Sequence, residues 1–184
     1  MLPLMFGIGI GSMVTGRVVS RTGRTAIYPS VGLIIVTAAL VALGFLAGHL
    51  GIRQLSLFLF VTGLFMGTVM GVVQVTVQNA AGLASLGSAA ASVQLSRSIG
   101  AAVGTALVGT VLFASLSLGN AQTAHLFATL VQQGPDAIAA LPPARQVLAL
   151  AEIATAFRAA FLTMAAFSAV GLLLAWSIPT RRLS

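Results

Sequence analysis

GRVVSRTGRT, residues 16–25, is the stretch of sequence that decides the fold. It is a short arginine-rich segment between two uncharged apolar runs, residues 1–16 and 25–52. Arginine collects on the cytoplasmic side of membrane proteins, just beyond the ends of their spanning segments. The segment therefore predicts a hairpin of two membrane-crossing helices that turns in the cytoplasm.

The composition also favours a lipid environment. The chain has 184 residues, of which 58% are hydrophobic and 6% are charged, and its mean hydropathy is +1.08. Soluble domains carry about 25% charged residues, so this chain lacks the polar groups that a water-facing surface needs. A helical coat or fibre protein is the alternative, but it would show heptads flanked by charges, and this sequence has none.

The charges mark the ends of five apolar runs. We expect spans at about residues 2–19, 26–48, 55–77, 93–117 and 158–178. An external loop over residues 119–157 connects the last two spans. Backbone groups in lipid must bond to one another, so the spans should be helices and the fold an all-α integral membrane protein. Within the loop, the segments AHLFATLVQQ and ARQVLALAEIATAF predict two short helices on the membrane surface.

The arginines also predict the orientation. With the first hairpin turn inside, six arginines lie on the inner side and three on the outer side. The positive-inside rule favours this arrangement, with the C-terminus in the cytoplasm and the chain in the plasma (bacterial inner) membrane. The first run is short for a span and starts within an apolar stretch, so we expect Met1 to be internal to a longer protein.

Glycines recur every four residues in three of the runs. They are Gly7 and Gly11, then Gly63, Gly67 and Gly71, then Gly100 and Gly104. Glycines at this spacing share one helix face and let another backbone approach closely. Two roles remain open: plain helix packing, or smooth faces along which helices slide during a transport cycle.

Polar side chains at membrane depth are few, which makes them candidates for a cavity or pathway. They are Gln74, Gln78, Asn79, Gln94 and Arg97. A buried amide or guanidinium is costly in lipid and usually faces a cavity or a partner. Gln74 and Gln78 lie four residues apart and so share a face. The alternatives are a hydrogen bond between helices for Gln74, and a side chain that reaches the inner headgroups for Arg97.

Several function classes are excluded or disfavoured. The chain has no cysteine, and its only acids are Asp136 and Glu152. No cluster of catalytic or metal-ligating side chains is therefore expected, and neither an enzyme nor a metal site is predicted. The net charge of +7 does not indicate nucleic acid, because the arginines lie scattered at the ends of apolar runs.

The arginine-rich segment resembles the loop signature of the major facilitator superfamily, G-x-x-x-D-R-x-G-R-R. The matching residues are Gly16, Arg21, Gly23 and Arg24. Ser20 stands in place of the acidic residue and Thr25 in place of the last basic one. In that superfamily a weaker copy of the signature occurs in the second half of the fold, and a degenerate copy followed by four more apolar runs fits that location.

Residues 67–113 are similar to the penultimate helices of the 14-helix drug:proton antiporter branch, with Arg97, Gly100 and Gly104 at the matching positions. The resemblance covers essentially the whole chain. It implies about five transmembrane helices that form most of the C-terminal half of the superfamily fold. The missing N-terminal helices would be partners of this chain within the complete protein.

The function that the resemblance implies is secondary active transport, with export of lipophilic small molecules driven by the proton gradient and no bound cofactor. Proton coupling needs an ionisable group inside the membrane, and both acids of this chain fall in the external loop. The coupling group is therefore expected in the missing helices. The alternative is a small accessory or assembly subunit that packs on a larger complex through its glycine faces.

Overall fold

The computed structural model describes residues 2–22, 27–48, 50–134 and 142–177, and all of its regular structure there is helical. Five long helices occupy the five predicted apolar runs: α1 (Leu2–Thr22), α2 (Ile27–Leu46), α3 (Ile52–Ala81), α4 (Leu86–Gly119) and α7 (Pro143–Ser177). A short helix, α5 (Ala121–Gln133), follows α4, and a single 3-10 turn, η1 (Leu83–Ser85), joins α3 to α4.

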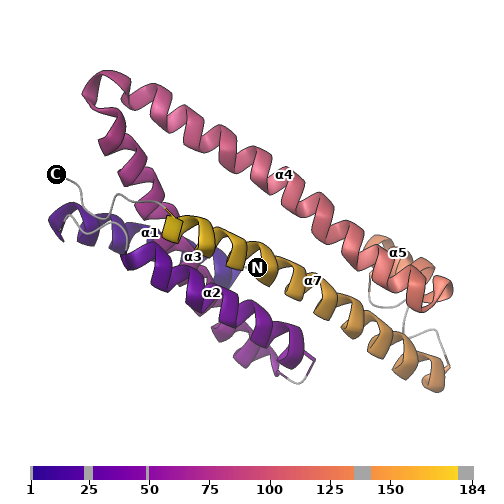
Figure 1. Ribbon diagram of the computed structural model, residues 1–184. Coiled ribbons are helices and arrows are strands. Elements are labelled where there is room, and N and C mark those ends of the chain that lie inside the picture. Colours follow the sequence, from indigo (N-terminus) through magenta and orange to yellow (C-terminus); the bar gives the residue numbers. More distant parts are fainter. Residues whose placement is uncertain (1, 23–26, 49, 135–141, 178–184) are drawn as a thin grey trace.

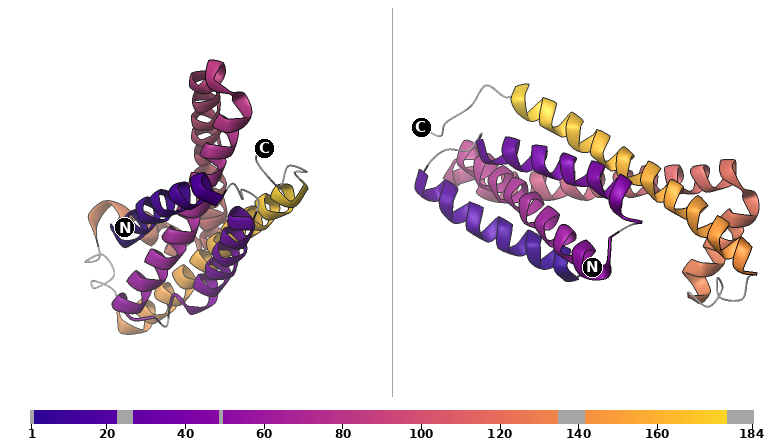
Figure 2. Two further views of the ribbon diagram at one scale, coloured as in Figure 1. Left: turned by 90° about the vertical axis from the view of Figure 1, so that its left-hand side faces the viewer. Right: turned by 90° about the horizontal axis from the view of Figure 1, so that it is seen from below.

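The long helices alternate in direction along the chain (Figure 1). The C-terminal ends of α1, α3 and α7 lie toward one end of the molecule, and the α2–α3 turn and α5 lie toward the other (Figures 1 and 2). This is the arrangement that the predicted hairpins require. The helix ends that precede the segments assigned to the cytoplasm by the arginine count therefore share one end of the molecule.

Among the described residues, three helices are long and apolar enough to cross a membrane: α3, α4 and α7. Within α1 and α2, Leu2–Val18 and Ser30–Leu46 are shorter apolar helices. The all-helical, membrane-embedded class is thus supported by the structure. The number of spans, five, stays a prediction.

The last long helix begins earlier than the predicted span. We predicted an external loop over residues 119–157 and a last span beginning at 158. In the structure α7 begins at Pro143 and runs without a break to Ser177, and the position of the membrane boundary along it stays a prediction. Residues 144–170 contain neither glycine nor proline and are rich in alanine and leucine, so nothing interrupts the helix. Pro143 suits the first helical position, where its missing N–H group is not needed. The second predicted surface helix is therefore the first part of α7.

The first predicted surface helix is present as α5. The Asn120 side chain caps it by accepting a hydrogen bond from the Gln122 backbone N–H at 3.0 Å. It ends at Gly134, which has φ +90° and donates its N–H to the Leu130 carbonyl at 2.9 Å. Glycine is the residue that adopts this conformation without strain. The capping side chain of Asn120 and the positive φ of Gly134 therefore set the two ends of this helix.

Helix packing follows a simple chain of neighbours. In space, α1 packs on α3, α3 on α2, α2 on α7, and α7 on α4, with α5 against the outer ends of α4 and α7. The most intimate of these contacts is α1 with α3. Residues of α2, α3, α4 and α7 also line an open space among these helices.

Candidate functional site

An apolar cleft lies between α2, α3, α4 and α7. Its volume is about 1560 Å³. Two large apolar side chains per helix illustrate its lining: Leu40 and Phe45 from α2, Met66 and Met70 from α3, Val103 and Leu107 from α4, and Phe161 and Phe167 from α7. Phe, Met and Leu side chains are adaptable and present no charge, so such a wall suits lipophilic molecules of varied shape.

The neutral polar side chains in this lining are largely satisfied by the protein itself. Thr62 donates its hydroxyl to the Phe58 carbonyl at 2.8 Å, and Thr155 donates to the Ala151 carbonyl at 2.9 Å. Ser168 shares a hydrogen bond of 2.8 Å with the hydroxyl of a threonine on α2, and that bond joins α2 to α7. These hydroxyls therefore already have hydrogen-bond partners within the protein.

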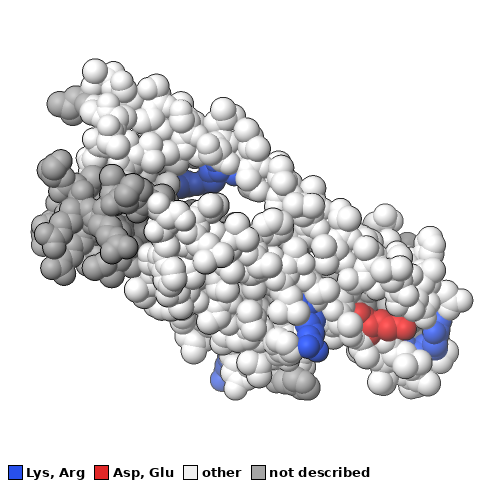
Figure 3. Space-filling view, viewed as in Figure 1, with Lys and Arg blue, Asp and Glu red and all other residues white. Residues whose placement is uncertain are grey.

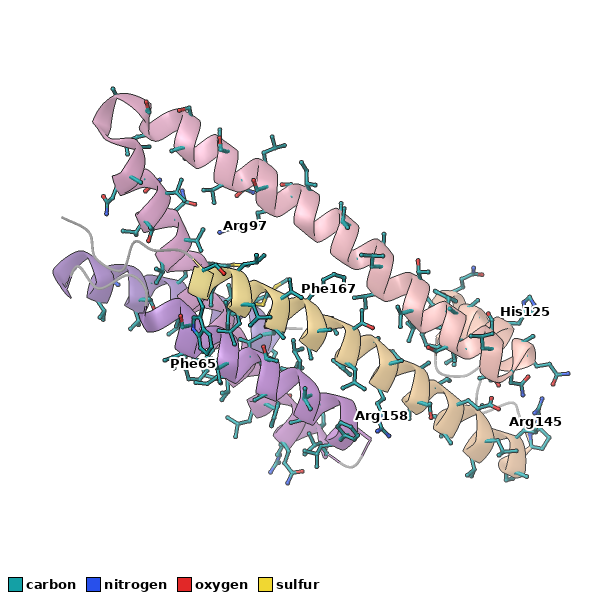
Figure 4. The ribbon with its side chains drawn as sticks, in the orientation of Figure 1. Phe65, Arg97, His125, Arg145, Arg158 and Phe167 are labelled. Atoms are coloured by element: carbon teal, nitrogen blue, oxygen red, sulfur yellow. The ribbon has the colours of Figure 1, made fainter. Side chains whose placement is uncertain are left out.

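Arg158 is the one charged side chain in the described lining of the cleft. Its guanidinium carbon lies 4.0 Å from the centre of the Phe45 ring, a cation–π distance. Figure 4 shows Arg158 directed from α7 toward the end of the neighbouring hairpin that carries this ring. Arg158 has no hydrogen bond to any described residue, so its N–H groups are available to a further partner.

The sequence analysis missed this pair, because it treated Arg158 only as the boundary of the last span. Phe157 and Phe161 flank it in the segment AFRAAF, and all three residues line the cleft. The position of an arginine between two phenylalanines in the sequence was the signal that could have indicated this site. Its partner Phe45 comes from another helix and could not be found from local sequence.

The five predicted pathway residues do not line this cleft. Gln74, Gln78 and Asn79 lie in the last turns of α3, and Gln94 and Arg97 lie in the first half of α4. They therefore gather about the α3–α4 turn, at the end of the molecule that we assign to the cytoplasm. The structure brings them to the same hairpin but not into the apolar cleft.

Arg97 lies near the cleft, because Gly100, one turn further along α4, belongs to the lining. Its side chain is half-buried and has no hydrogen-bond partner among the described residues. Figure 4 shows it directed away from α4 toward the side of the molecule that holds α3 and α7. Nearby on α3, the Thr76 hydroxyl is buried without a hydrogen-bond partner in the described part of the chain.

The glycine repeats fall into two different environments. An ideal Cβ on Gly63 or Gly67 would overlap the α1 backbone at Leu4 or Ile8, and one on Gly71 would lie 2.9 Å from the Ser12 carbonyl oxygen. In the same way Gly7 and Gly11 face the α3 backbone. These glycines allow α1 and α3 to touch through their main chains.

Gly100 and Gly104, which we expected to pack another helix, meet no atom within 4 Å of an added Cβ. Both line the cleft instead. Their lack of side chains widens the cleft along α4. The same spacing of glycines thus serves close packing on α3 and open space on α4.

A polar cluster closes the outer end of the molecule. The Glu152 carboxylate on α7 accepts a hydrogen bond from the buried Thr123 hydroxyl and one from Asn120 at 3.4 Å. Arg145 donates to the Gln122 side chain on α5. Below them the Phe127 ring of α5 meets phenylalanine rings of α4 and α7 edge-on, at centroid distances of 5.8 and 6.0 Å. These contacts fix α5 as a cap.

Charged side chains are sparse on the surface, as Figure 3 shows for one face of the molecule. Among the described residues no three His, Cys, Asp or Glu side chains come together in a group that could hold a metal ion. Of the loop signature, Gly16 and Arg21 belong to α1, whereas Gly23 and Arg24 lie outside the described residues.

Two curated proteins of Mycobacterium tuberculosis, from strains CDC 1551 and H37Rv, are similar to this chain. Each is described as an uncharacterized MFS-type transporter, and each is 30% identical over 176 residues. The match covers 95% of this chain and 26% of either relative, so the chain spans about a quarter of their length. No family model matches the chain, and no solved structure matches it.

The similarity supports membership of the major facilitator superfamily. Together with the apolar helices, it supports a membrane location.

Proposed function

We propose that this chain forms one wall of the substrate cavity of a secondary active transporter, a proton-coupled exporter of lipophilic small molecules. The single observation that carries the proposal is the apolar cleft of about 1560 Å³ between α2, α3, α4 and α7. Sites for drug-sized ligands are typically apolar and have volumes of about 300–1,000 Å³. The cleft is large enough for such ligands.

The proposal includes the position of the chain within a longer protein. The resemblance of the arginine-rich segment to the second-half copy of the superfamily signature favours the C-terminal half of the fold. The match to about a quarter of each relative is compatible with that assignment. The remaining helices would then close the open side of the cleft.

Proton coupling, within this proposal, uses a group from those other helices. No carboxylate lies in the described lining of the cleft, and Glu152 is engaged by α5 at the outer end. Proton relays in membranes rely on ionisable side chains that face the interior. This chain contributes the apolar surface, and the exchange of protons takes place elsewhere in the protein.

Export assays on cells test the proposal through a cleft-filling substitution, Gly104→Phe. Gly104 lines the cleft and no atom lies within 4 Å of a Cβ added there, so the phenylalanine ring would project into the cleft and reduce its volume. We expect the efflux of a neutral lipophilic dye such as Nile red to fall about ten-fold at unchanged protein level, and efflux by the unaltered protein to stop when a protonophore collapses the gradient.

The matched control is Gly171→Phe on α7, because Gly171 also has open space around it but does not line the cleft. We expect that variant to export the dye normally. Equal export by both variants would contradict a role for the cleft in transport. Export that survives the protonophore would contradict proton coupling alone.

A further inference from the structure

We propose that the apolar cleft binds amphipathic anions, with Arg158 as the anchor for the acidic headgroup. This inference rests on the proposed function, because it takes the cleft as the substrate cavity. It goes further by naming the chemical class of the ligand: a carboxylate, sulfonate or phosphate group on a lipophilic body.

The first argument is the sign of the charge. Arg158 is the only charged residue in the described lining, and no described acid accompanies it there. Charges interact strongly where water is scarce, so a cationic ligand in this cleft would be repelled and an anionic one attracted. The nearest described acid on the same helix, Glu152, is occupied by Thr123 and Asn120 and does not line the cleft.

The second argument is the free edge of the guanidinium. The Arg158 guanidinium carbon lies 4.0 Å from the centre of the Phe45 ring, and Arg158 has no hydrogen bond to any described residue. Its N–H groups are therefore available to a ligand. A guanidinium edge fits a carboxylate or a sulfonate through two parallel hydrogen bonds.

The third argument is the surface beside the anchor. Phe157 and Phe161 flank Arg158 on α7, and both line the cleft together with Phe167 further along the helix. An apolar chain or ring attached to the acid would lie along these rings. The site therefore combines one charge-assisted contact with a long apolar wall, which is the arrangement that an amphipathic anion requires.

The test is equilibrium binding of radiolabelled dodecanoate to the full chain in phosphatidylcholine nanodiscs. Dodecyltrimethylammonium serves as the probe of equal chain length and opposite charge. We expect saturable binding of dodecanoate and none of the cation. Loss of one charge-assisted contact in Arg158→Gln should weaken dodecanoate binding about ten-fold or more.

The matched control is Arg53→Gln, because Arg53 is an exposed arginine in the first turn of α3 and does not line the cleft. That variant should bind dodecanoate like the unaltered chain. A second variant, Phe45→Leu, retains the charge but removes the stack, and it should bind more weakly than Arg53→Gln. Undiminished binding by Arg158→Gln would overturn the inference.

A displacement series on the unaltered chain keeps the inference testable if Arg158→Gln does not fold. Unlabelled dodecylsulfonate should displace dodecanoate, and dodecyltrimethylammonium should not; equal displacement by both would overturn the inference. Phosphatidylglycerol added to the nanodiscs separates two sources of the same chemistry. Displacement by this lipid identifies a lipid headgroup at Arg158, and its failure to displace identifies a free organic acid.

The outcomes also separate this inference from the proposed function. Equal binding of both charges, together with loss of dye export in Gly104→Phe, would refute the charge preference and leave the transporter. Selective anion binding, together with normal export in Gly104→Phe, would refute the transport role of the cleft and leave the anion site.

Discussion

The contact between α1 and α3 should fail when a single methyl group is added at Gly67. An ideal Cβ there would lie 2.9 Å from the Ile8 carbonyl carbon and closer still to its oxygen, whereas ordinary contacts lie at 3.4–4 Å. The difference, 3.4 minus 2.9, means that α1 must move away by at least 0.5 Å. The obstacle is main chain, which cannot rotate aside as a side chain can.

The energy of this change has two opposing terms. Alanine is a better helix former than glycine by about 0.5–1 kcal/mol. Overpacking a close contact costs about 1–3 kcal/mol, and a shift of α1 would also loosen the matching contacts at Gly63 and Gly71. We therefore expect Gly67→Ala to destabilise the protein, with the steric term exceeding the helical one.

The assay is the melting midpoint of the purified protein in mild detergent, followed by loss of its monodisperse peak on size exclusion. Gly67→Ala should lower the midpoint by a few degrees. Gly9→Ala on α1 is the control, because Gly9 has no atom within 4 Å of an added Cβ. It should leave the midpoint unchanged or raise it. Equal midpoints for the two variants would refute the argument from close packing.

Two further predictions concern the outer cap and the orientation. Thr123→Val keeps the shape of the side chain but removes the hydroxyl that donates a hydrogen bond to Glu152. It should lower the free energy of unfolding by about 1.5–3 kcal/mol in melting experiments. The Thr129 hydroxyl donates only to the His125 carbonyl of its own helix, so Thr129→Val should lower the free energy of unfolding by less. Equal losses for the two variants would contradict the role of α5 as a cap. Ser20→Cys should react with a membrane-impermeant thiol reagent only from the cytoplasm; labelling from outside would reverse the topology.

Sequence patterns predicted the helices better than their ends. The apolar runs and the charges between them indicated all five long helices and one of the two surface helices. They failed at the start of α7, because Arg145 and Glu152 were assigned to the external loop and Arg158 to the boundary of the last span. In the structure these side chains lie on a continuous helix that begins at Pro143. Helix propensity and the absence of glycine and proline outweighed the local charge.

The candidate site was less predictable than the fold. The polar residues Gln74, Gln78 and Arg97 stood out because they are rare in apolar runs, yet none of them lines the cleft, whose lining is mostly ordinary apolar side chains. The local sequence around an apolar residue in a spanning helix does not indicate whether its side chain faces a cavity or the lipid. Arg158 was visible as a charge, but its contact with Phe45 joins residues far apart in the sequence.

The amino-acid sequence alone determined that this chain is a bundle of lipid-embedded helices, because a chain with so few charges must satisfy its backbone internally and bury its surface in hydrocarbon. Its loop signature also resembles that of the major facilitator superfamily. Only the tertiary structure decided that Gly67 meets another backbone while Gly104 opens into a cleft. When a helix is apolar on every side, its sequence does not show which face contacts another helix. The contacting faces are decided by how well whole helix surfaces fit together in three dimensions.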